Sequence, residues 1–189
     1  MTTASPATFA PATRSVGAFE HLARAGRALG LPTSVVFQVT DRCHYDCIHC
    51  YETHAGTNEL SLSEIERILD ELADLGVLLL TITGGEPFIR RDADDILRAA
   101  RARGFSVRVK TTGHFIDEPR ADLLAALGAM QVDLSLFAGD PRVHDGITRI
   151  EGSWERTITA ARRLRARGVA VRLNATVMHA NVEELVALK

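Results

Sequence analysis

The residues best suited to chemistry are the three cysteines, which lie together in the segment Cys43-His-Tyr-Asp-Cys47-Ile-His-Cys50. The spacing C-x3-C-x2-C places three thiols on one short loop. Three thiolates so placed can bind three corners of a cubane [4Fe–4S] cluster. The fourth iron would then lack a protein ligand and could bind a substrate. The spacing therefore predicts an iron–sulfur centre with one open coordination position.

Three other chemistries are open to the same loop. Structural zinc could use the cysteines with His44, His49 or His54, although such sites usually draw their ligands from two separated knuckles. Cys47 and Cys50 also form a C-x-x-C pair of the redox type, but that motif normally opens a helix and needs no third cysteine. Buried free thiols are the last alternative, which the polar neighbours disfavour. Spacing alone favours the cluster and leaves these alternatives open.

A second motif, Gly84-Gly85-Glu86-Pro87, follows an apolar run that ends at Thr83. Two glycines at the end of a strand let the backbone approach a ligand closely. Pro87 offers no N–H, and Glu86 supplies acceptors for an ammonium group. Taken alone, the motif is equally typical of an ordinary glycine turn with a solvent-facing glutamate.

A regular alternation of strands and helices surrounds both motifs. We expect strands at 34–40, 77–83, 106–111, 131–136 and 169–177. We expect helices at 16–29, 62–75, 93–103, 120–127 and 154–167, and a further helix capped by Asn181 that still runs at Lys189. Short links between strands and helices predict parallel strands with right-handed crossovers, and apolar strands fit a sheet covered by helices. The expected fold class is α/β, a partial (β/α) barrel with about five of the βα units of a six-unit core.

This alternation brings the two motifs together. The cysteine segment follows the first expected strand and the Gly84–Pro87 segment follows the second. Parallel α/β sheets bind their ligands at the carboxyl ends of the strands. We therefore expect both segments at one edge of the sheet, in register with each other.

Three regions are expected along the chain. Residues 1–15 are rich in Ala, Thr, Ser and Pro and predict a disordered tail. Residues 16–33 form an N-terminal helix and linker, and residues 34–189 form the core domain. The expected helix after Asn181 shows no stop signal, so we expect the core to be incomplete at its C-terminal end.

The composition excludes several classes of protein. The net charge of −2 gives no general attraction to nucleic acid or to an anionic membrane. No apolar run approaches the ~20 residues that span a bilayer. The odd, clustered set of cysteines is not a disulfide framework. Such thiols suit a reducing compartment, so we expect a cytoplasmic protein.

The cysteine spacing, its place after the first strand, and the Gly-Gly-Glu-Pro segment after the second strand resemble the radical S-adenosylmethionine superfamily. The resemblance runs from about residue 34 to the end of the chain. It implies that Cys43, Cys47 and Cys50 bind a [4Fe–4S] cluster, and that Gly84, Gly85, Glu86 and Pro87 receive the amine of S-adenosylmethionine. It further implies reductive cleavage of that cofactor to a 5′-deoxyadenosyl radical, which abstracts hydrogen from a substrate.

The resemblance extends less specifically to other positions. It implies that Ser135 contacts the ribose or carboxylate of the cofactor and that the Arg149 fork meets the carboxylate. Asn174, Thr112 and Gly113 are implied to line the pocket. His49 stands where the family commonly has an aromatic residue, so its ring or that of Tyr51 would pack beside the adenine. Alternatively, Ser135 and Asn174 satisfy local backbone groups and Arg149 caps a helix; His44, His54 and His114 are expected to be surface or loop residues.

The segment from Ser135 to Trp154 is similar to radical enzymes that carry a cysteine-rich C-terminal extension and often modify peptides or proteins. No further cysteine exists here, so we expect a truncated enzyme or a short relative. The resemblance implies an external electron donor of the flavodoxin or ferredoxin type and a peptide or protein substrate. The alternatives are a non-catalytic iron–sulfur or zinc-binding module and, third, a thiol oxidoreductase that uses Cys47 and Cys50.

Overall fold

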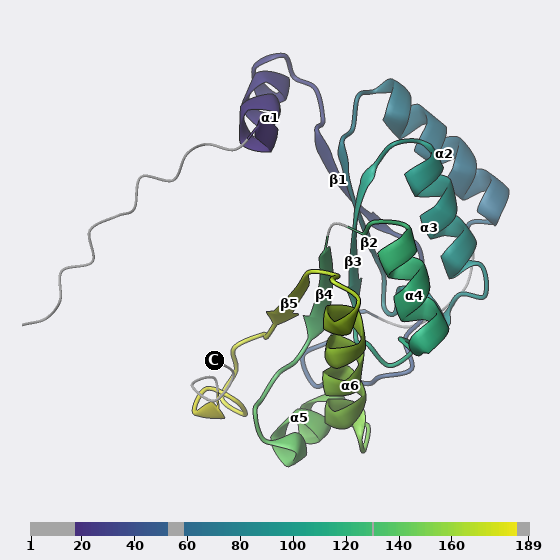
Figure 1. The fold of residues 1–189 in the computed structure, drawn as a ribbon. Helices are drawn as coiled ribbons and strands as arrows, with labels where there is room; N and C mark the ends of the chain where they lie inside the picture. The colour runs from purple at the N-terminus through teal and green to yellow at the C-terminus, as the bar shows by residue number, and fades with distance from the viewer. Residues whose placement is uncertain (1–17, 53–58, 130, 185–189) are drawn as a thin grey trace, which may run out of the picture.

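The computed structural model describes residues 18–52, 59–129 and 131–184, and within this range it contains one parallel sheet (Figure 1). The strands lie in chain order from β1 to β5, and each pairs with the next in parallel register. The first and last strands are not paired with each other, so the sheet is open. Their bounds are β1 Ser34–Gln38, β2 Leu79–Thr83, β3 Ser106–Thr111, β4 Gln131–Ser135 and β5 Val171–Asn174. The expected α/β class and the partial barrel are confirmed.

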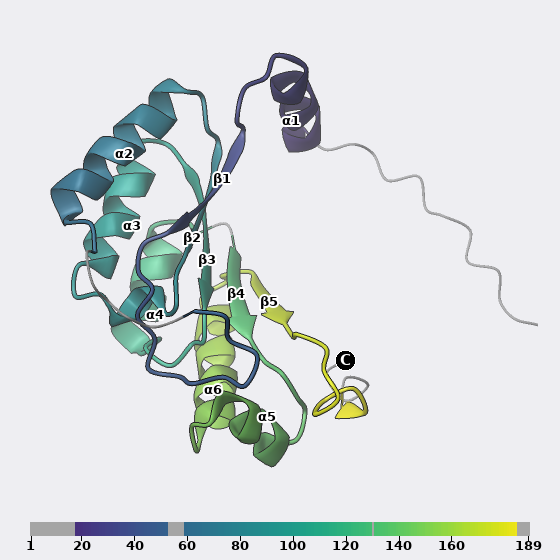
Figure 2. The same cartoon turned by 180° about the vertical axis from the view of Figure 1, so that it is seen from behind.

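Helices cover one face of this sheet, as the two opposite views show (Figures 1 and 2). The expected helices form α1 Ala18–Ala28, α2 Leu62–Asp74, α3 Ala93–Ala102, α4 Glu118–Ala126 and α6 Ser153–Ala166. The start of α2 is fixed by a capping box, in which Ser61 and Glu64 each accept from the other's backbone N–H. None of the helices among the described residues is long and apolar enough to cross a membrane.

Two short helices were not expected from the sequence. They are the 3-10 helix η1, Pro87–Ile89, and the α-helix α5, Pro141–Thr148. Asp140 caps α5 by accepting from the N–H of Arg142, and the proline follows it directly. Of the helix expected after Asn181, the structure describes only residues 182–184, in which Val182 and Glu183 form a turn and Glu184 has a 3-10 conformation; residues 185–189 and the tail 1–15 lie outside the described part. The Asn181 amide instead donates to the carbonyls of Phe137 and Thr176, both at 2.8 Å.

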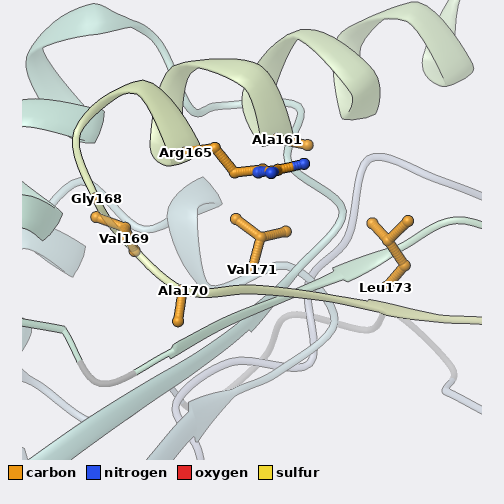
Figure 3. Close-up of a pocket in the computed structure, with 7 residues that line it drawn as sticks. All are labelled: Ala161, Arg165, Gly168, Val169, Ala170, Val171 and Leu173. Atoms are coloured by element: carbon orange, nitrogen blue, oxygen red, sulfur yellow. The ribbon is translucent and has the colours of Figure 1, made fainter.

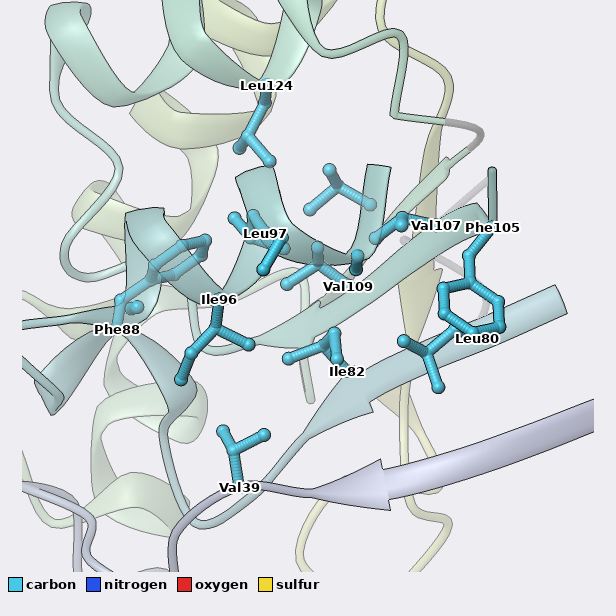
Figure 4. Close-up of a cluster of buried hydrophobic side chains, with 14 of the residues drawn as sticks. Val39, Leu80, Ile82, Phe88, Ile96, Leu97, Phe105, Val107, Val109 and Leu124 are labelled. Atoms are coloured by element: carbon cyan, nitrogen blue, oxygen red, sulfur yellow. The ribbon is translucent and has the colours of Figure 1, made fainter. Parts of the chain in front are cut away.

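The hydrophobic core lies between the sheet and this helical layer (Figure 4). Alternate residues of the central strands point into it, such as Leu80 and Ile82 of β2, and Ile96 and Leu97 of α3 pack against them. Burial of each such side chain contributes roughly 1.5–3 kcal/mol to folding. The opposite face of the sheet has no helical cover, and Val36 of β1 is 63 % exposed there. The helical cover that the apolar strands indicated is therefore found, within the described residues, on one face of the sheet only.

Candidate active site

The cysteine loop lies where the sequence predicts, directly after β1 at the carboxyl edge of the sheet. All three cysteines are free thiols and line one cavity of about 370 Å³. The ends of β2, β3 and β4 contribute the opposite wall. The lining residues are Cys43, Tyr45, Cys47, His49, Cys50, Tyr51, Glu52, Thr83, Gly84, Gly85, Lys110, Thr112, Ser135, Phe137 and Thr176.

The three thiols are close enough to influence one another. Burial, and then the neighbouring Cys43 and Cys50, raise the pKa of Cys47 to about 12. Burial also raises the pKa of Cys43. Yet among the described residues no three His, Cys, Asp or Glu side chains converge on a point that could hold one metal ion. A cubane cluster takes its cysteines on separate irons, whereas zinc needs its ligands within about 2.3 Å of one centre, so the donor set fits the cluster better.

The cysteine loop is held in place by the distant end of α5. The N–H of Asp46 donates to the Thr148 carbonyl at 3.3 Å, and the N–H of Ile48 donates to the Ile147 carbonyl at 3.0 Å. The Arg149 guanidinium then pairs with the Asp46 carboxylate at 2.6 Å. Figure 2 shows the loop after β1 crossing the same end of the sheet as α5. The loop does not open a helix, unlike the C-x-x-C motif of redox dithiols.

Arg149 does not take the position implied by the resemblance. Its side chain is half exposed, does not line the cavity, and makes its ion pair on the outside of the loop. Its backbone ends α5 with a left-handed φ of 58°. The alternative that it caps a helix end is the one that the structure supports.

Positions 84 and 85 must be glycine because the backbone that leads into the cysteine loop passes too close to leave room for a side chain. A Cβ on Gly84 would lie 2.5 Å from the Thr40 carbonyl oxygen, and one on Gly85 would overlap the Arg42 carbonyl. The N–H of Gly85 donates to the Thr40 carbonyl at 2.9 Å, and the N–H of Glu86 donates to the Arg42 carbonyl at 2.8 Å. Both glycines also line the cavity. Their lack of a side chain therefore lets the β2 turn dock on the segment that leads into Cys43.

We expect Gly85→Ala to lower the free energy of unfolding by about 1–3 kcal/mol, because the added methyl group meets rigid backbone. Urea unfolding of the apoprotein measures this loss. Gly146→Ala is the matched control, since a Cβ there meets no atom within 4 Å and the position lies inside α5. Equal stability of the Gly85→Ala and wild-type proteins would contradict the docking role.

Glu86 is turned away from the cavity, contrary to expectation. The carboxylate is fully buried and accepts from the N–H and hydroxyl of Thr112, both at 2.7 Å. It also accepts from the hydroxyl of Thr111 at 2.8 Å and the N–H of Phe88 at 3.1 Å. Burial raises its pKa against the opposing effect of these bonds. Pro87 begins η1 and is buried as well, so this half of the motif joins β2 to β3 rather than facing a ligand.

The remaining predicted residues divide between the cavity and the surface. Ser135 lines the cavity, and His49 lines it with its ring 4.7 Å from that of Phe137. Tyr51 stands at the mouth and is 89 % exposed. Asn174 does not line the cavity; it is exposed, and its carbonyl accepts from the N–H of Leu136. The cavity residues that the sequence did not indicate include Tyr45, Lys110, Phe137 and Thr176.

Two of the histidines expected at the surface belong to the wall behind the cysteine loop. The ring of His44 lies 4.3 Å from that of Tyr45 and 4.1 Å from that of His114. Burial lowers the pKa of His44 to about 4, and both of its ring nitrogens lack a hydrogen-bond partner among the described residues. Both are loop residues, which agrees with the expectation of surface or loop histidines, and both are partly buried. His54 lies outside the described residues.

His144 is a further functional-site residue that the sequence did not reveal. Its ring is fully buried on α5, and Nδ1 accepts from the N–H of Phe137 at 3.1 Å. The two rings stack with centroids 5.5 Å apart. Since Phe137 in turn supports His49, His144 fixes one wall of the cavity from behind.

The burial of His144 makes stability depend on pH. Burial lowers its pKa from 6.5 to about 4, so the unfolded chain binds a proton at a higher pH than the folded protein. Stability is therefore lost as the pH falls from about 6.5 to about 4, by about 3 kcal/mol in total. The His144→Gln variant still offers the N–H of Phe137 an acceptor but has no group that takes up this proton. Between these pH values we expect its free energy of unfolding to fall by about 3 kcal/mol less than that of wild type, as measured by urea unfolding. Identical pH profiles would contradict this assignment.

A second cavity, of about 430 Å³, lies on the helical side of the edge strand β5 (Figure 3). Val171 and Leu173 point from β5 toward Ala161 and Arg165 of α6. It contains no cysteine, and Arg165 is its only ionisable residue. The chemistry therefore belongs to the cavity at the cysteine loop.

An open parallel sheet with three free thiols and a docked glycine turn at its carboxyl edge defines an α/β core of the partial-barrel type with a thiol-rich site. The family model described as the radical SAM superfamily matches residues 37–189. The chain belongs to this superfamily, and it is an enzyme core.

The relatives and solved structures agree with this membership. The chain is 33 % identical over 157 residues to a PqqA peptide cyclase of Ruegeria pomeroyi, covering 82 % of this chain and 42 % of that protein. It is 28 % identical to an AdoMet-dependent heme synthase of Methanosarcina barkeri, over 82 % of this chain and 45 % of that protein. The structure of Streptococcus suis SuiB bound to S-adenosylmethionine superposes with a TM-score of 0.76 at 24 % identity, covering 89 % of this chain and 40 % of SuiB. The SuiB complex with its precursor peptide SuiA gives 0.72 at 25 % identity over 88 % of this chain and 39 % of that one. The chain thus spans less than half the length of these relatives.

Proposed function

We propose that this chain binds a [4Fe–4S] cluster through Cys43, Cys47 and Cys50 and binds S-adenosylmethionine in the adjoining cavity. The observation that carries the proposal is the shared cavity, which three free thiols and the Gly84-Gly85 turn line together in a member of the radical SAM superfamily. When bound by these cysteines, the cluster would supply the single electron for cleavage of S-adenosylmethionine at its sulfur–C5′ bond, which would give methionine and a 5′-deoxyadenosyl radical able to take a hydrogen atom from the substrate.

The protein's own residues position the cofactor and exclude water. The N–H groups of Gly85 and Glu86 donate to the Thr40 and Arg42 carbonyls, so the backbone of this turn is fixed before a ligand arrives. The Ser135 hydroxyl at the end of β4 offers a donor and an acceptor to the ribose or carboxylate. The rings of His49 and Phe137, which meet edge to face with their centroids 4.7 Å apart, form an aromatic corner of the cavity against which we expect the adenine to pack.

We propose a peptide as the substrate. The support is the resemblance to the PqqA peptide cyclase and to SuiB, which was solved with the precursor peptide SuiA. A porphyrin is the competing substrate class, because a heme synthase is also a relative. The proposal includes an oxidoreductase chemistry, an external flavodoxin or ferredoxin as electron donor, and a reducing cytoplasmic compartment in which the thiols stay free.

Anaerobic reconstitution with iron and sulfide tests the proposal. We expect about four iron and four sulfide per chain. Dithionite and S-adenosylmethionine should then release 5′-deoxyadenosine. Tight zinc without iron uptake would replace the proposal with the zinc module. Cluster uptake without 5′-deoxyadenosine would reduce the chain to a non-catalytic module, and reversible Cys47–Cys50 disulfide exchange without iron would favour the thiol oxidoreductase.

A further inference from the structure

The face of the sheet that no helix covers carries charged side chains. Along β3, Val107 and Val109 point into the core and are buried. Successive side chains of a strand point to opposite faces, so Arg108 and Lys110 point to the open face. Interiors of (β/α) barrels are usually filled by branched apolar side chains. Cations at these positions indicate a surface made for a polar ligand.

Three of the charged residues lie in one line across neighbouring strands. The register places Lys110 of β3 opposite Asp133 of β4, and Asp133 opposite Arg172 of β5. The backbones of adjacent strands lie about 4.8 Å apart. The backbones of Lys110 and Arg172 therefore flank that of Asp133 at about this distance on each side. We call these three residues the charged row. Asp133 is only 3 % exposed and accepts from the amide of Gln131 on the same face.

The cations of this face lack protein partners. Within the described part of the chain, Arg108, Lys110 and Arg172 make no side-chain hydrogen bond or ion pair, and Nε of Arg108 is buried without an acceptor. Several arginines of the helical face, by contrast, form ion pairs with acids. Examples are Arg120 with Asp94 at 2.9 Å, Arg163 with Glu118 at 2.7 Å and Arg167 with Asp122 at 2.5 Å. A buried donor without an acceptor destabilises the protein, and acceptor oxygens of a bound ligand would relieve this cost.

The charged row begins at the cysteine cavity. Lys110 lines that cavity with Cys43, Cys47 and Ser135, and the row runs from it across the open face to β5. Glu52, the acid that also lines the cavity, accepts instead from the amide of Gln38 at 3.1 Å. A ligand bound on the row would therefore place its neighbouring atoms beside the cofactor cavity.

We propose that the charged row binds a carboxylate of the substrate, and that this carboxylate is an acidic side chain of a peptide. The inference rests on the proposed function, which supplies the peptide. Lys110 and Arg172 provide charge-assisted donors, the arginine as a fork that matches a carboxylate. The Asp133 carboxylate, which the strand register places between them, would repel a further carboxylate of the ligand at that position.

Binding of two dansyl-labelled peptides, Ala-Glu-Ala-Glu-Ala-Glu-Ala and its Gln counterpart, tests the inference. Fluorescence anisotropy is recorded at low salt on the cluster-loaded protein with S-adenosylmethionine. We expect the Glu peptide to bind about tenfold more tightly than the Gln peptide, and Arg172→Gln to reduce this preference below about threefold. Arg172→Glu should favour a Lys peptide. Arg162→Gln, an exposed arginine on the outer face of α6, is the matched control and should keep the wild-type preference.

Equal binding of the Glu and Gln peptides to wild type would overturn the inference. An equal loss of the preference for the Glu peptide in Arg172→Gln and in Arg162→Gln would overturn it as well. Coproporphyrin III, a tetracarboxylate, is the competing source of carboxylates. Coproporphyrin III could displace the Glu peptide from the wild-type protein but not from Arg172→Gln, and could itself be converted to product during turnover. In that case the charged row binds a porphyrin, and the peptide assignment is wrong. Iron content and 5′-deoxyadenosine release are measured on the same samples. If the protein binds iron and releases 5′-deoxyadenosine but does not prefer the Glu peptide, only the inference about the charged row is refuted. If the protein does not bind iron, the proposed function is refuted.

Discussion

Cys47→Ser is expected to abolish 5′-deoxyadenosine release, lowering its rate by more than about a thousandfold. Cys47 is the middle thiol of the loop and interacts electrostatically with both other cysteines. A serine hydroxyl is a far weaker iron ligand, so the cubane would lose one corner. The measurements are iron and sulfide content after anaerobic reconstitution, the visible absorption of the cluster, and 5′-deoxyadenosine by chromatography.

The control for this substitution comes from the same loop. Ile48 is adjacent to Cys47, its side chain is 47 % exposed, and it does not line the cavity. Ile48→Ala should therefore bind iron and release 5′-deoxyadenosine as wild type does. A Cys47→Ser protein that retains four iron atoms and cleaves S-adenosylmethionine would show that the third ligand lies elsewhere.

Glu86→Ala should cost the protein about 3–4 kcal/mol of unfolding free energy, which is unusually large for one substitution. Truncation leaves two backbone N–H groups and two threonine hydroxyls without their buried acceptor. Glu86→Gln keeps the shape but presents an amide to some of these donors, so we expect a smaller loss of about 1–3 kcal/mol. Urea unfolding of the apoproteins gives both values.

Glu71→Ala, which removes an exposed glutamate of α2, is the matched control and should change stability by no more than about 0.5 kcal/mol. Binding of S-adenosylmethionine separates the structural role from a ligand role. If Glu86→Ala unfolds at the wild-type urea concentration but no longer binds S-adenosylmethionine, the carboxylate contacts the cofactor amine and the buried network is unimportant.

The fold could be predicted because its signals are local. The strand and helix pattern, the capping box at Ser61 and the glycines that end helices each depend on a few neighbouring residues. Parallel topology then places the cysteine loop and the Gly84-Gly85 turn at one edge. Ser135 and His49, which the resemblance assigns to the cofactor, do line the cavity, and their contacts with the cofactor stay predictions.

The errors concern contacts between distant segments. Glu86 and Thr112 are 26 residues apart, and nothing near Glu86 indicates that its carboxylate turns inward. Arg149 pairs with Asp46, which lies 103 residues earlier in the chain. The residues near Arg149 therefore do not indicate that its side chain points away from the cavity. The α5 helix was missed because it has only eight residues and contains Gly146. The exposed alternation of β1 depends on the absence of cover on one face, which an apolar run does not reveal.

The attachment of the cysteine loop to the end of α5 has a consequence for biosynthesis. The loop hydrogen bonds to the carbonyls of Ile147 and Thr148, which are translated about a hundred residues after Cys43. A nascent chain carries all three thiols long before it carries their anchor. Since domains fold as units once their contacts are available, iron delivered to the ribosome-bound chain would meet an unsupported loop. We therefore expect the proposed metal centre to mature only after α5 has left the exit tunnel.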